Sequence, residues 1–473
     1  MINPEIFREY DIRGIADRDL TPPVIESLGR AFAAYLKRKG IMSATVGYDA
    51  RTSSPRLCDD IVRGLTAGGV NVTILGLCPT PALYFSLHHL NPGAGVMITG
   101  SHNPSEFNGF KLCVGKETIY GEEIQKIRRI IESGAGGQES EERDKTGTVQ
   151  QWPILPDYID YLTNQFKNIR GPRLKIALDA GNGTAGLAAP EVIRSMGCNV
   201  IELFSEPDGR FPNHHPDPTI PKNLAALIDT VLAQKADAGI AFDGDADRIG
   251  VVDEQGNILW GDQLMVIFSR DILQEHPGSI FVSEVKCSQT MYDDIRSRGG
   301  NAVMWKTGHS LIKAKMKELR AALAGEMSGH LFFADRYFGY DDAIYAACRI
   351  VEIIKKLKSA RGGSPSLGML LADLPKTYNT PEIRFDCPDN IKFKVVEKAK
   401  EIFTQGDNLS RKPREVITVD GVRAVFENGW GLIRASNTQP VLVMRFEAND
   451  PASLEFIKTM MEQKVRALVS SLS

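Results

Sequence analysis

The sequence predicts an α/β protein with three related α/β domains, whose sheets are mixed and mostly parallel, and a distinct smaller α+β C-terminal domain. An apolar strand, a polar or glycine-containing loop, an amphipathic helix, a glycine and a second apolar strand recur three times along the chain. Strands that alternate with helices in this way are typical of βαβ units. The chain after about residue 370 lacks this unit. Its 473 residues suit about three or four domains of roughly 100–200 residues each.

The three units can be followed in order. The first runs through "SATVGYDAR" (43–51), a helix from Pro55 to Thr66 and "GVNVTILGL" (69–77). The second runs through "LKIALDAGNG" (174–183), "LAAPEVIRSM" (187–196) and "GCNVIELF" (197–204). The third runs through "SIFVSEVKCS" (279–288), "TMYDDIRSR" (290–298) and "GNAVMWKT" (300–307). The C-terminal segment has two strand-like runs, "AVFEN" and "VLVMRFEA", and a helix from Pro451 to about Ser470.

Two segments predict flexible connections. "SGAGGQESEERDKTG" (133–147) is glycine-rich and then charged, and "SARGGSPS" (359–366) is rich in small residues. We therefore place the domains at 1–148, 149–253, 254–366 and 367–473.

The composition excludes several classes of protein. Lys and Arg number 56 and Asp and Glu 59, so the net charge of −3 argues against nucleic acid as the main partner. No apolar run approaches the ~18 residues of a membrane span, and "MINPEIFREYDIRG" carries charges where a secretory signal needs an apolar core. The seven scattered cysteines form no CxxC pair, which indicates reduced thiols and a cytoplasmic location.

The stretch "GIAFDGDADRIGVVD" (239–253) places Asp243, Asp245 and Asp247 between two apolar runs. Like charges this close repel one another, and a divalent cation such as Mg²⁺ or Ca²⁺ would remove that cost. A solvated acidic turn is the simplest alternative.

Two other interpretations of the same aspartates remain. An EF-hand loop that starts at Asp243 would end at Glu254, but Arg248 stands where that loop needs glycine. A phosphatase with an aspartyl-phosphate would also use Asp-x-Asp after a strand. Resemblance to that family implies a small hydroxyl residue near position 247, where this sequence has Asp247.

The stretch "VMITGSHNPSEFNGFK" (96–111) brings Ser101, His102 and Asn103 together where an apolar run ends, and Lys111 follows. A polar turn explains this stretch when it is considered alone.

A glycine pattern, Gly181, Gly183 and Gly186 with Glu202 further along, matches the dinucleotide-binding fingerprint. It keeps an NAD(P)-dependent oxidoreductase open as an alternative.

The stretch "LAGEMSGH" (323–330) alternates Glu326, Ser328 and His330. In an extended segment these side chains would share one face and could bind sugar hydroxyls.

The stretch "GLIRASNTQPVLVMRFEA" (431–448) has the guanidinium, hydroxyl and amide donors that suit a phosphate group. The donors are Arg434, Ser436, Asn437 and Thr438. The polar stretches "FREYDIRG" (7–14) and "KTGHS" (306–310) are uninformative by themselves.

Together these stretches resemble the α-D-phosphohexomutase family, most closely its phosphomannomutase/phosphoglucomutase branch. "YDIRG" opens the series, "TGSHNP" resembles the phosphoserine loop, "DGDADR" the metal loop, "GEMSGH" the sugar-binding loop and "RASNTQP" the phosphate-binding loop. The motifs occur in the family's order over nearly the whole chain. The resemblance implies four domains around a central cleft.

The resemblance also implies roles. Ser101 would carry the transferable phosphoryl group and, with Asp243, Asp245 and Asp247, would hold Mg²⁺. Catalytic candidates beside Ser101 are Arg13, Lys111 and His330. Glu326 and Ser328 would contact sugar hydroxyls, and Arg434, Ser436, Asn437 and Thr438 the non-reacting phosphate. The remaining residues expected at the substrate are Tyr10, His102, Arg248, Lys286, His309 and His330.

The implied activity interconverts hexose 1-phosphate and hexose 6-phosphate, of mannose, glucose or both. Mg²⁺ would be the cofactor and a hexose 1,6-bisphosphate the intermediate and activator. The partners would be small sugar phosphates, and the protein would be a monomer or a weak homo-oligomer. A phosphoglucosamine mutase remains an alternative, although that branch more often has Gln near Met327. A non-catalytic sugar-phosphate or Ca²⁺-binding protein is another.

Overall fold

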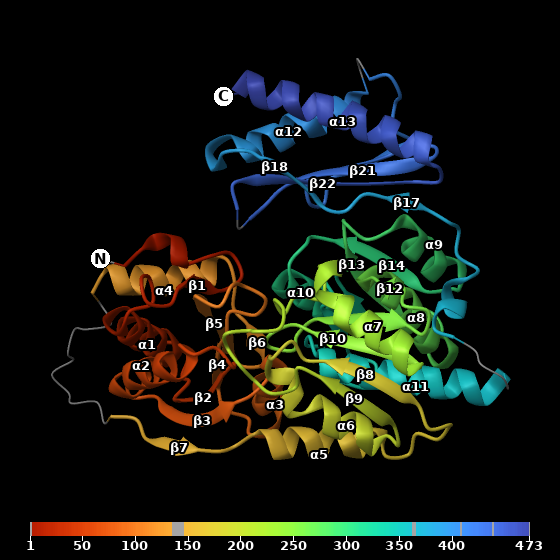
Figure 1. Ribbon diagram of the computed structural model, residues 1–473. Coiled ribbons are helices and arrows are strands. Elements are labelled where there is room, and N and C mark those ends of the chain that lie inside the picture. The colour runs from red at the N-terminus through yellow and green to blue at the C-terminus, as the bar shows by residue number, and fades with distance from the viewer. Residues whose placement is uncertain (1, 135–145, 362–365, 407–408, 438, 473) are drawn as a thin grey trace. The chain divides into compact units, whose positions relative to one another are not determined.

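The computed structural model describes residues 2–134, 146–361, 366–406, 409–437 and 439–472 (Figure 1). The described residues form two compact units. Unit 1 comprises residues 1–264 and 328–370, and unit 2 comprises residues 265–327 and 371–473. Residues 135–145 and 362–365 of the two segments expected to be flexible connections lie outside the described residues.

Unit 1 begins with a mixed sheet in the strand order β1-β5-β4-β2-β3-β7, with β6 beside β5. β2 pairs in parallel with both β3 and β4, whereas β5 is antiparallel to β1 and β4. The strands are β1 (Ile12–Ile15), β2 (Ser43–Tyr48), β3 (Asn71–Leu77), β4 (Ala94–Ile98), β5 (Phe107–Val114), β6 (Glu117–Thr118) and β7 (Val149–Gln151).

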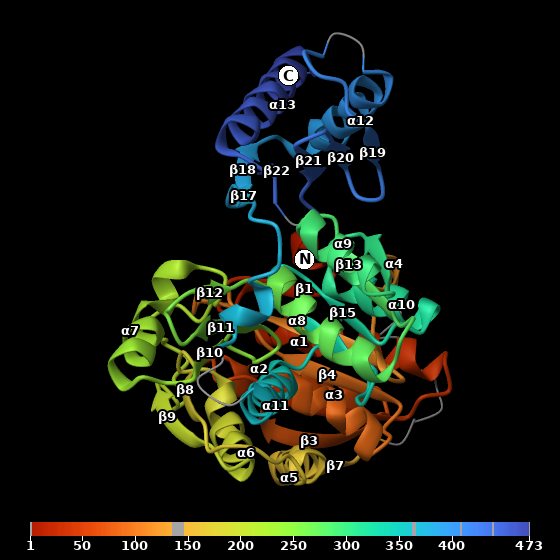
Figure 2. The ribbon, with the colours of Figure 1, turned by 90° about the vertical axis from the view of Figure 1, so that its right-hand side faces the viewer.

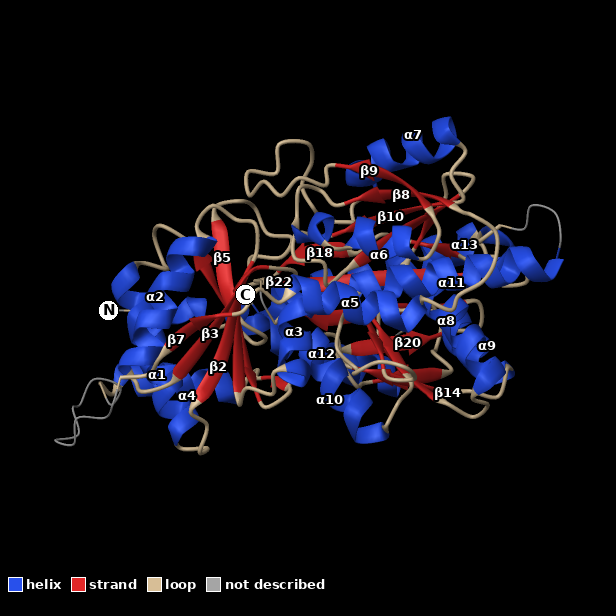
Figure 3. Cartoon of the chain, turned by 90° about the horizontal axis from the view of Figure 1, so that it is seen from below, coloured by secondary structure: helices blue, strands red, loops and turns tan. Residues whose placement is uncertain are grey.

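Helices cover both faces of this sheet. Helices α1 and α2 lie on one face and α3 on the other, as the views in Figures 1 and 3 both show. The amphipathic helix α4 adds three buried isoleucines to the hydrophobic core that also contains residues of α1 and α2. The helical segments are η1 (Pro4–Ile6), α1 (Pro22–Lys37), α2 (Ser54–Ala67), α3 (Thr80–His89) and α4 (Glu122–Glu132).

A second mixed sheet of unit 1 has the order β12-β11-β10-β8-β9. β8 pairs in parallel with β9 and β10, and β10 and β11 form an antiparallel hairpin. The strands are β8 (Lys175–Asp179), β9 (Asn199–Leu203), β10 (Ala238–Phe242), β11 (Ile249–Asp253) and β12 (Ile258–Leu259). The accompanying segments are α5 (Leu155–Phe166), η2 (Thr184–Leu187), α6 (Ala189–Ser195), η3 (Pro221–Leu224), α7 (Ala225–Gln234), β16 (Leu331–Phe333) and α11 (Ala343–Arg361).

Unit 2 contains a parallel set of strands and an antiparallel sheet. The parallel order is β14-β13-β15, with β13 (Ile280–Glu284), α9 (Gln289–Ser297), β14 (Asn301–Trp305), α10 (His309–Leu319) and β15 (Leu323–Gly325). The residues of α8 (Gly261–Glu275) and η4 (Gly368–Leu371) are shared between the two units.

The antiparallel sheet of unit 2 has the order β17-β22-β21-β20-β19, with β18 also paired to β22. Helices α12 and α13 pack together over it (Figures 1 and 2). The elements are β17 (Tyr378–Asn379), β18 (Ile383–Asp386), α12 (Asp389–Gln405), β19 (Glu415–Ile417), β20 (Val422–Val425), β21 (Gly429–Ala435), β22 (Val441–Ala448) and α13 (Pro451–Leu472).

The predicted fold class is confirmed. The three predicted βαβ units are β2-α2-β3, β8-α6-β9 and β13-α9-β14, and the two strands of each pair in parallel. The C-terminal segment is a separate α+β arrangement. The strand expected over "AVFEN" ends at Val425, because the N–H of Phe426 already turns back to the carbonyl of Gly429. Among the described helices, none is long and apolar enough to cross a membrane.

The buried side chain of Asp342 predicts that the stability of unit 1 depends on pH. This buried carboxylate accepts hydrogen bonds from the hydroxyls of Tyr158 and Tyr337 and from the N–H of Tyr345. Burial raises the pKa of Asp342 to about 6. An unfolded aspartate has a pKa of about 3.9. Between about pH 4 and 6 Asp342 therefore keeps its proton in the folded protein, whereas it has lost that proton in the unfolded chain. The free energy of unfolding therefore falls as pH rises through this window, by about 3 kcal/mol.

We expect Asp342→Asn to keep a hydrogen-bond acceptor and to remove this titration. The fall in the urea midpoint of unit 1 between about pH 4 and pH 7 should then be smaller than in the unaltered protein. Asp160→Asn, on the exposed side of α5, is the matched control and should keep the full fall. An equal fall in Asp342→Asn and in the unaltered protein would show that Asp342 does not cause it.

Candidate active site

Ser101 lies in the loop after β4, with a backbone φ of +49°, in the left-handed region that non-glycine residues rarely adopt. Its side chain is buried, and its Oγ donates a hydrogen bond to Asp243 Oδ2 at 2.6 Å. Oγ also lies 3.0 Å from Nδ1 of His102. The N–H of Ser101 donates to Thr99 Oγ1 at 2.8 Å. The sharp turn at the strand end thus directs the hydroxyl toward the aspartate loop.

The aspartate loop connects β10 and β11, so the hairpin brings Asp243, Asp245 and Asp247 to one end of the sheet. All three are buried, and one ligand atom from each lies within 4.8 Å of the others. Burial and the neighbouring carboxylates raise the pKa of Asp243 well above its ordinary value. The site therefore needs more positive charge than this loop supplies.

Lys111, on β5, supplies part of that charge. Its Nζ lies 2.8 Å from Asp245 Oδ2 and also pairs with Asp247. Burial opposes the charge of Lys111, but the carboxylates outweigh burial and raise its pKa. Burial likewise opposes ionisation of Asp245, but Lys111 outweighs it and lowers the pKa of Asp245. Lys111 therefore stays protonated.

Two carboxylate oxygens at this site accept no hydrogen bond from a described residue and are available to bind a cation. Asp245 Oδ2 accepts from Thr80, Thr99 and Lys111. By contrast, Asp245 Oδ1 and Asp247 Oδ1 are buried and accept no hydrogen bond from any described residue. Buried carboxylate oxygens that accept no hydrogen bond fit a divalent cation with a preference for hard oxygen ligands. The three aspartates can therefore hold a metal ion.

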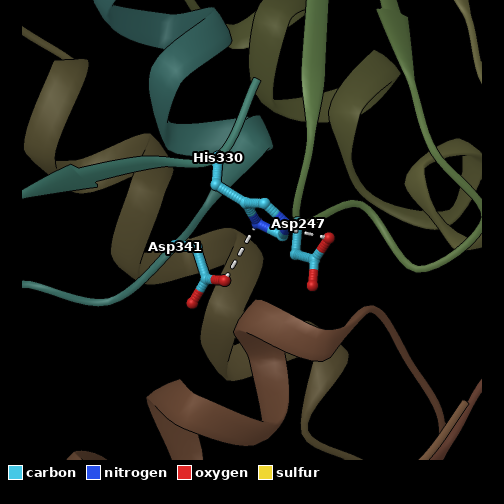
Figure 4. A group of neighbouring side chains, drawn as sticks. All are labelled: Asp247, His330 and Asp341. Carbon is cyan, nitrogen blue, oxygen red and sulfur yellow. Dashed lines mark ion pairs between the residues drawn. The ribbon is translucent and has the colours of Figure 1, made fainter. Parts of the chain in front are cut away.

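His330 faces the same loop (Figure 4). Its Nε2 accepts a hydrogen bond from Nε of Arg248 at 2.9 Å. Its Nδ1 lies 3.1 Å from Asp341 Oδ2 and 3.6 Å from Asp247 Oδ1. Because Nε2 is an acceptor, the neutral ring carries its proton on Nδ1, toward the carboxylates. The Nδ1 proton therefore faces Asp341 and Asp247.

Arg13 and His102 lie beside this centre. Arg13 Nη1 donates to Asn103 Oδ1 at 2.9 Å, so it contacts the Ser101 loop. Burial and the nearby charges of Arg248 and Arg13 hold the pKa of His102 well below its ordinary range, so His102 is neutral. Tyr10 is partly buried in the turn before β1.

The extended conformation considered for Glu326, Ser328 and His330 is wrong. β15 ends at Gly325, and residues 327 and 328 form a turn. Gly329 has a φ of +90°, and a Cβ there would lie 2.3 Å from the carbonyl oxygen of Ile249. The close approach requires glycine at 329, and its positive φ breaks the extended backbone, so alternate residues do not share one face.

Unit 2 holds a second set of predicted residues. Lys286 Nζ lies 3.4 Å from Glu284 and 3.2 Å from Glu382. Glu326 Oε1 accepts the N–H of Gly308 at 2.7 Å, at the start of α10, where His309 is the first helical residue.

Arg434 lies at the end of β21, and its Nε donates to Asp420 Oδ2 at 3.0 Å. Asp420 Oδ2 also accepts the N–H of Thr307 at 3.0 Å. Ser436 and Asn437 follow β21, and Ser436 is buried while Asn437 is exposed. The predicted Thr438 lies outside the described residues.

Sequence reasoning missed several charged partners, namely Asp341, Glu284, Glu382 and Asp420. Glu284 carried a usable signal, because a charged residue within an apolar strand is rarely buried without a partner. Asp341 and Asp420 lie in polar segments without a distinctive spacing, and only the fold brings them to His330 and Arg434.

The glycine pattern at 181–186 has a packing explanation. A Cβ at Gly183 would lie 2.7 Å from the carbonyl oxygen of Gly244, in the aspartate loop. A Cβ at Gly186 would lie 1.9 Å from the carbonyl oxygen of Ser205. Glu202 pairs with Arg194. Protein backbone therefore occupies the space that the dinucleotide interpretation assigned to a cofactor.

Comparison with known proteins decides the family. Four models of phosphoglucomutase/phosphomannomutase match in order: α/β/α domain I at residues 4–137, domain II at 156–256, domain III at 260–378 and the C-terminal domain at 382–464. The chain belongs to the phosphoglucomutase/phosphomannomutase family. The family interconverts hexose 1-phosphates and hexose 6-phosphates, and this chain is an isomerase of that class.

Relatives with high identity cover nearly the whole chain. A phosphomannomutase/phosphoglucomutase of Pseudomonas aeruginosa is 43% identical over 469 residues, covering 99% of this chain and 96% of the relative. A phosphoglucomutase of Neisseria gonorrhoeae is 42% identical over 473 residues, covering 99% and 98%. A crystal structure of a phosphoglucomutase/phosphomannomutase family protein from Burkholderia thailandensis superposes with a TM-score of 0.88 at 37% identity, covering 99% of this chain and 98% of that one.

Proposed function

We propose that Ser101 carries the phosphoryl group that this mutase transfers. The observation that carries the proposal is the placement of Ser101: a strained backbone turns its Oγ to within 2.6 Å of Asp243, in a buried cluster that also holds Lys111. Strained backbone conformations concentrate at functional sites. The positive charge of Lys111 suits a phosphoryl group on Oγ.

The proposed reaction has two transfers. The C6 hydroxyl of a hexose 1-phosphate attacks the phosphorus on Ser101, its O–P bond forms, and the bond from phosphorus to Ser101 Oγ breaks. Ser101 Oγ takes up a proton, and the hydroxyl proton passes to a base. In the second transfer, Ser101 Oγ attacks the phosphorus at C1 of the resulting hexose 1,6-bisphosphate and gives its proton to a base. The bond from phosphorus to O1 breaks, O1 takes up a proton, and hexose 6-phosphate leaves. Phosphoryl transfer of this kind depends mainly on positioning and charge.

His330 is the proposed base. Its Nε2 carries the lone pair of the neutral ring, which accepts from Arg248 Nε at 2.9 Å, so Arg248 must release Nε2 before this nitrogen takes up the substrate proton. Lys111 stays protonated and arginines such as Arg13 lose no proton in proteins, so both act electrostatically.

Mg²⁺ is the proposed cofactor. Asp243, Asp245 and Asp247 would hold it together with an oxygen on Ser101. The buried Oδ1 atoms of Asp245 and Asp247, which accept no hydrogen bond from a described residue, support this assignment. When bound, Mg²⁺ would neutralise charge on the phosphoryl group.

The substrate contacts are proposed from the motif positions. Arg434, Ser436, Asn437 and Thr438 would bind the non-reacting phosphate, and Glu326 and Ser328 would bind sugar hydroxyls. Further contacts would come from Tyr10, His102, Arg248, Lys286 and His309. The ion pair of Arg434 with Asp420 supports its assignment, because Asp420 holds one edge of the guanidinium and fixes its orientation.

We also propose a cytoplasmic location and a monomer or weak homo-oligomer. All seven cysteines are buried free thiols, which supports a reducing compartment. The domain boundaries at 148/149, 253/254 and 366/367 stay a prediction.

The test is a coupled assay of the full chain, charged with glucose 1,6-bisphosphate, on the 1-phosphates of mannose, glucose and glucosamine side by side. We expect turnover of mannose and glucose 1-phosphates, because they differ only at C2 and an uncontacted position discriminates weakly, by roughly 1–3 kcal/mol. Intact-mass analysis should show one phosphate, on Ser101. A preference above about 10⁴-fold between mannose and glucose would contradict dual use. A preference for the glucosamine compound would favour a phosphoglucosamine mutase.

A further inference from the structure

Arg51 is a buried arginine of unit 1 that the reaction scheme does not use. It lies in the loop after β2, and its side chain is 0% exposed. β2 and β4 are adjacent parallel strands, with Tyr48 opposite Ile98. The loops that follow parallel strands leave the same edge of a sheet. The Arg51 loop therefore lies beside the loop that carries Ser101.

The Arg51 guanidinium binds backbone carbonyl groups of the Ser101 loop. Nη1 donates to the carbonyl oxygens of Pro104 at 2.6 Å and Phe107 at 2.8 Å. Nη2 donates to those of Ser101 at 2.8 Å and Asn103 at 2.5 Å. One side chain thus joins four carbonyls of residues 101–107, including that of Ser101 itself.

Asp49 and Gly100 complete this contact. Asp49 Oδ2 lies 3.3 Å from Arg51 Nε and accepts the N–H of Gly100 at 3.1 Å. A Cβ at Gly100 would lie 2.4 Å from both Cζ and Nε of Arg51. Glycine at position 100 therefore lets the guanidinium reach the loop.

We propose that Arg51 is a positioning residue for phosphoryl transfer, which holds the Ser101 loop in one conformation whether or not Ser101 is phosphorylated. This inference rests on the proposed role of Ser101. The loop must keep its shape while the phosphoryl group leaves and returns in every turnover. All four acceptors are backbone carbonyls, so the contacts do not depend on the charge at Oγ.

The same geometry excludes a direct role of Arg51 in phosphate binding. Both terminal nitrogens already donate twice, and Nε faces Asp49. Of the five N–H groups of a guanidinium, the four on the terminal nitrogens donate to carbonyls, and the fifth, on Nε, makes no hydrogen bond with any described residue and faces the carboxylate of Asp49, which repels a phosphate oxygen. Arg51 also supports the left-handed backbone of Ser101, which costs free energy for a non-glycine residue.

The test compares Arg51→Lys and Gly100→Ala with the unaltered full-length chain. In Arg51→Lys the side chain keeps its positive charge but loses the planar guanidinium with its fixed N–H groups. In Gly100→Ala the arginine stays, and the new methyl group displaces its guanidinium from the loop. Arg349→Lys is the matched control, because Arg349 is also a buried arginine of unit 1 but pairs with Asp335 instead of the loop. The measurements are kcat, KM for glucose 1-phosphate, and the rate at which glucose 1,6-bisphosphate phosphorylates Ser101, followed by intact mass.

We expect Arg51→Lys to lower kcat and the phosphorylation rate by about 100-fold, the cost of a displacement of about 1 Å, with KM nearly unchanged. Gly100→Ala should lower both in the same direction, and Arg349→Lys should lower neither. The inference is overturned if Gly100→Ala, and Arg51→Lys where it folds, reduce kcat no more than Arg349→Lys does. If the unaltered, active chain acquires no phosphate on Ser101, the proposed function itself fails, and this inference fails with it.

Discussion

Replacement of Ser101 by alanine is expected to remove mutase activity, with a loss on the order of 10⁶-fold in kcat, as when other covalent nucleophiles are removed. The reason is chemical: without Oγ, no group in the loop can hold the phosphoryl group between the two transfers. The hydrogen bond from Oγ to Asp243 would also be lost. Activity is measured with glucose 1-phosphate in the presence of glucose 1,6-bisphosphate, and the phosphate content by intact mass.

Ser105→Ala is the matched control, because Ser105 is an exposed residue of the same loop. It should keep both the activity and the phosphate. Substantial turnover by Ser101→Ala, or a phosphate that persists in that variant, would assign the transferable group to another residue.

The local motifs could be found from the sequence because each lies within a few residues. The three βαβ units are visible from strand and helix periodicity, and the hairpin that carries Asp243, Asp245 and Asp247 is visible from two apolar runs around the acidic residues. The position of Ser101 at the end of β4 follows in the same way. Its left-handed backbone does not, because side-chain type gives little indication of a positive φ at serine.

Contacts between distant segments could not be predicted. Arg51 reaches carbonyls some fifty residues further along, and a backbone carbonyl leaves no trace in the sequence. Asp341 and Asp420 are ordinary polar residues until the fold places them beside His330 and Arg434. The alternation of Glu326, Ser328 and His330 predicted a shared face, which the turn at Gly329 rules out. Sequence patterns indicate the groups that carry the chemistry, and tertiary packing selects the residues that hold them.

Removal of divalent metal is expected to stop turnover, and Mg²⁺ is expected to restore it. Metal ions supply several kcal/mol of stabilisation to charged transition states, which corresponds to on the order of 10³-fold in rate. Asp243→Asn should show a loss of similar size that added Mg²⁺ does not reverse. Full activity after thorough chelation would contradict a metal role for the aspartate loop.

Asp243→Asn, which should lose activity, is expected to gain stability in the metal-free protein. Burial and the like charges of Asp247 and Asp245 raise the pKa of Asp243 in the folded protein above its unfolded value. The metal-free protein therefore loses stability as pH rises toward that pKa, and an asparagine at 243 removes this cost. Asparagine can still accept the N–H groups of Asp247 and Arg248, which Asp243 Oδ1 accepts at 3.1 and 3.2 Å.

Two thermal unfolding series near neutral pH separate these effects. Without metal, Asp243→Asn should unfold at a higher temperature than the unaltered protein; with Mg²⁺, only the unaltered protein should gain stability, because ligand binding stabilises the folded state by mass action. Asp253→Asn is the control: Asp253 is buried on the same hairpin, its Oδ1 accepts the N–H groups of Gln255 and Asn257, and its Oδ2 accepts from Asn257 Nδ2 at 3.0 Å, a hydrogen bond that asparagine cannot keep together with the other two. That variant should lose stability and keep the full response to Mg²⁺. If Asp243→Asn destabilises the metal-free protein as Asp253→Asn does, repulsion among the three carboxylates does not destabilise this loop. The physical argument for a cation at the aspartate loop is then wrong.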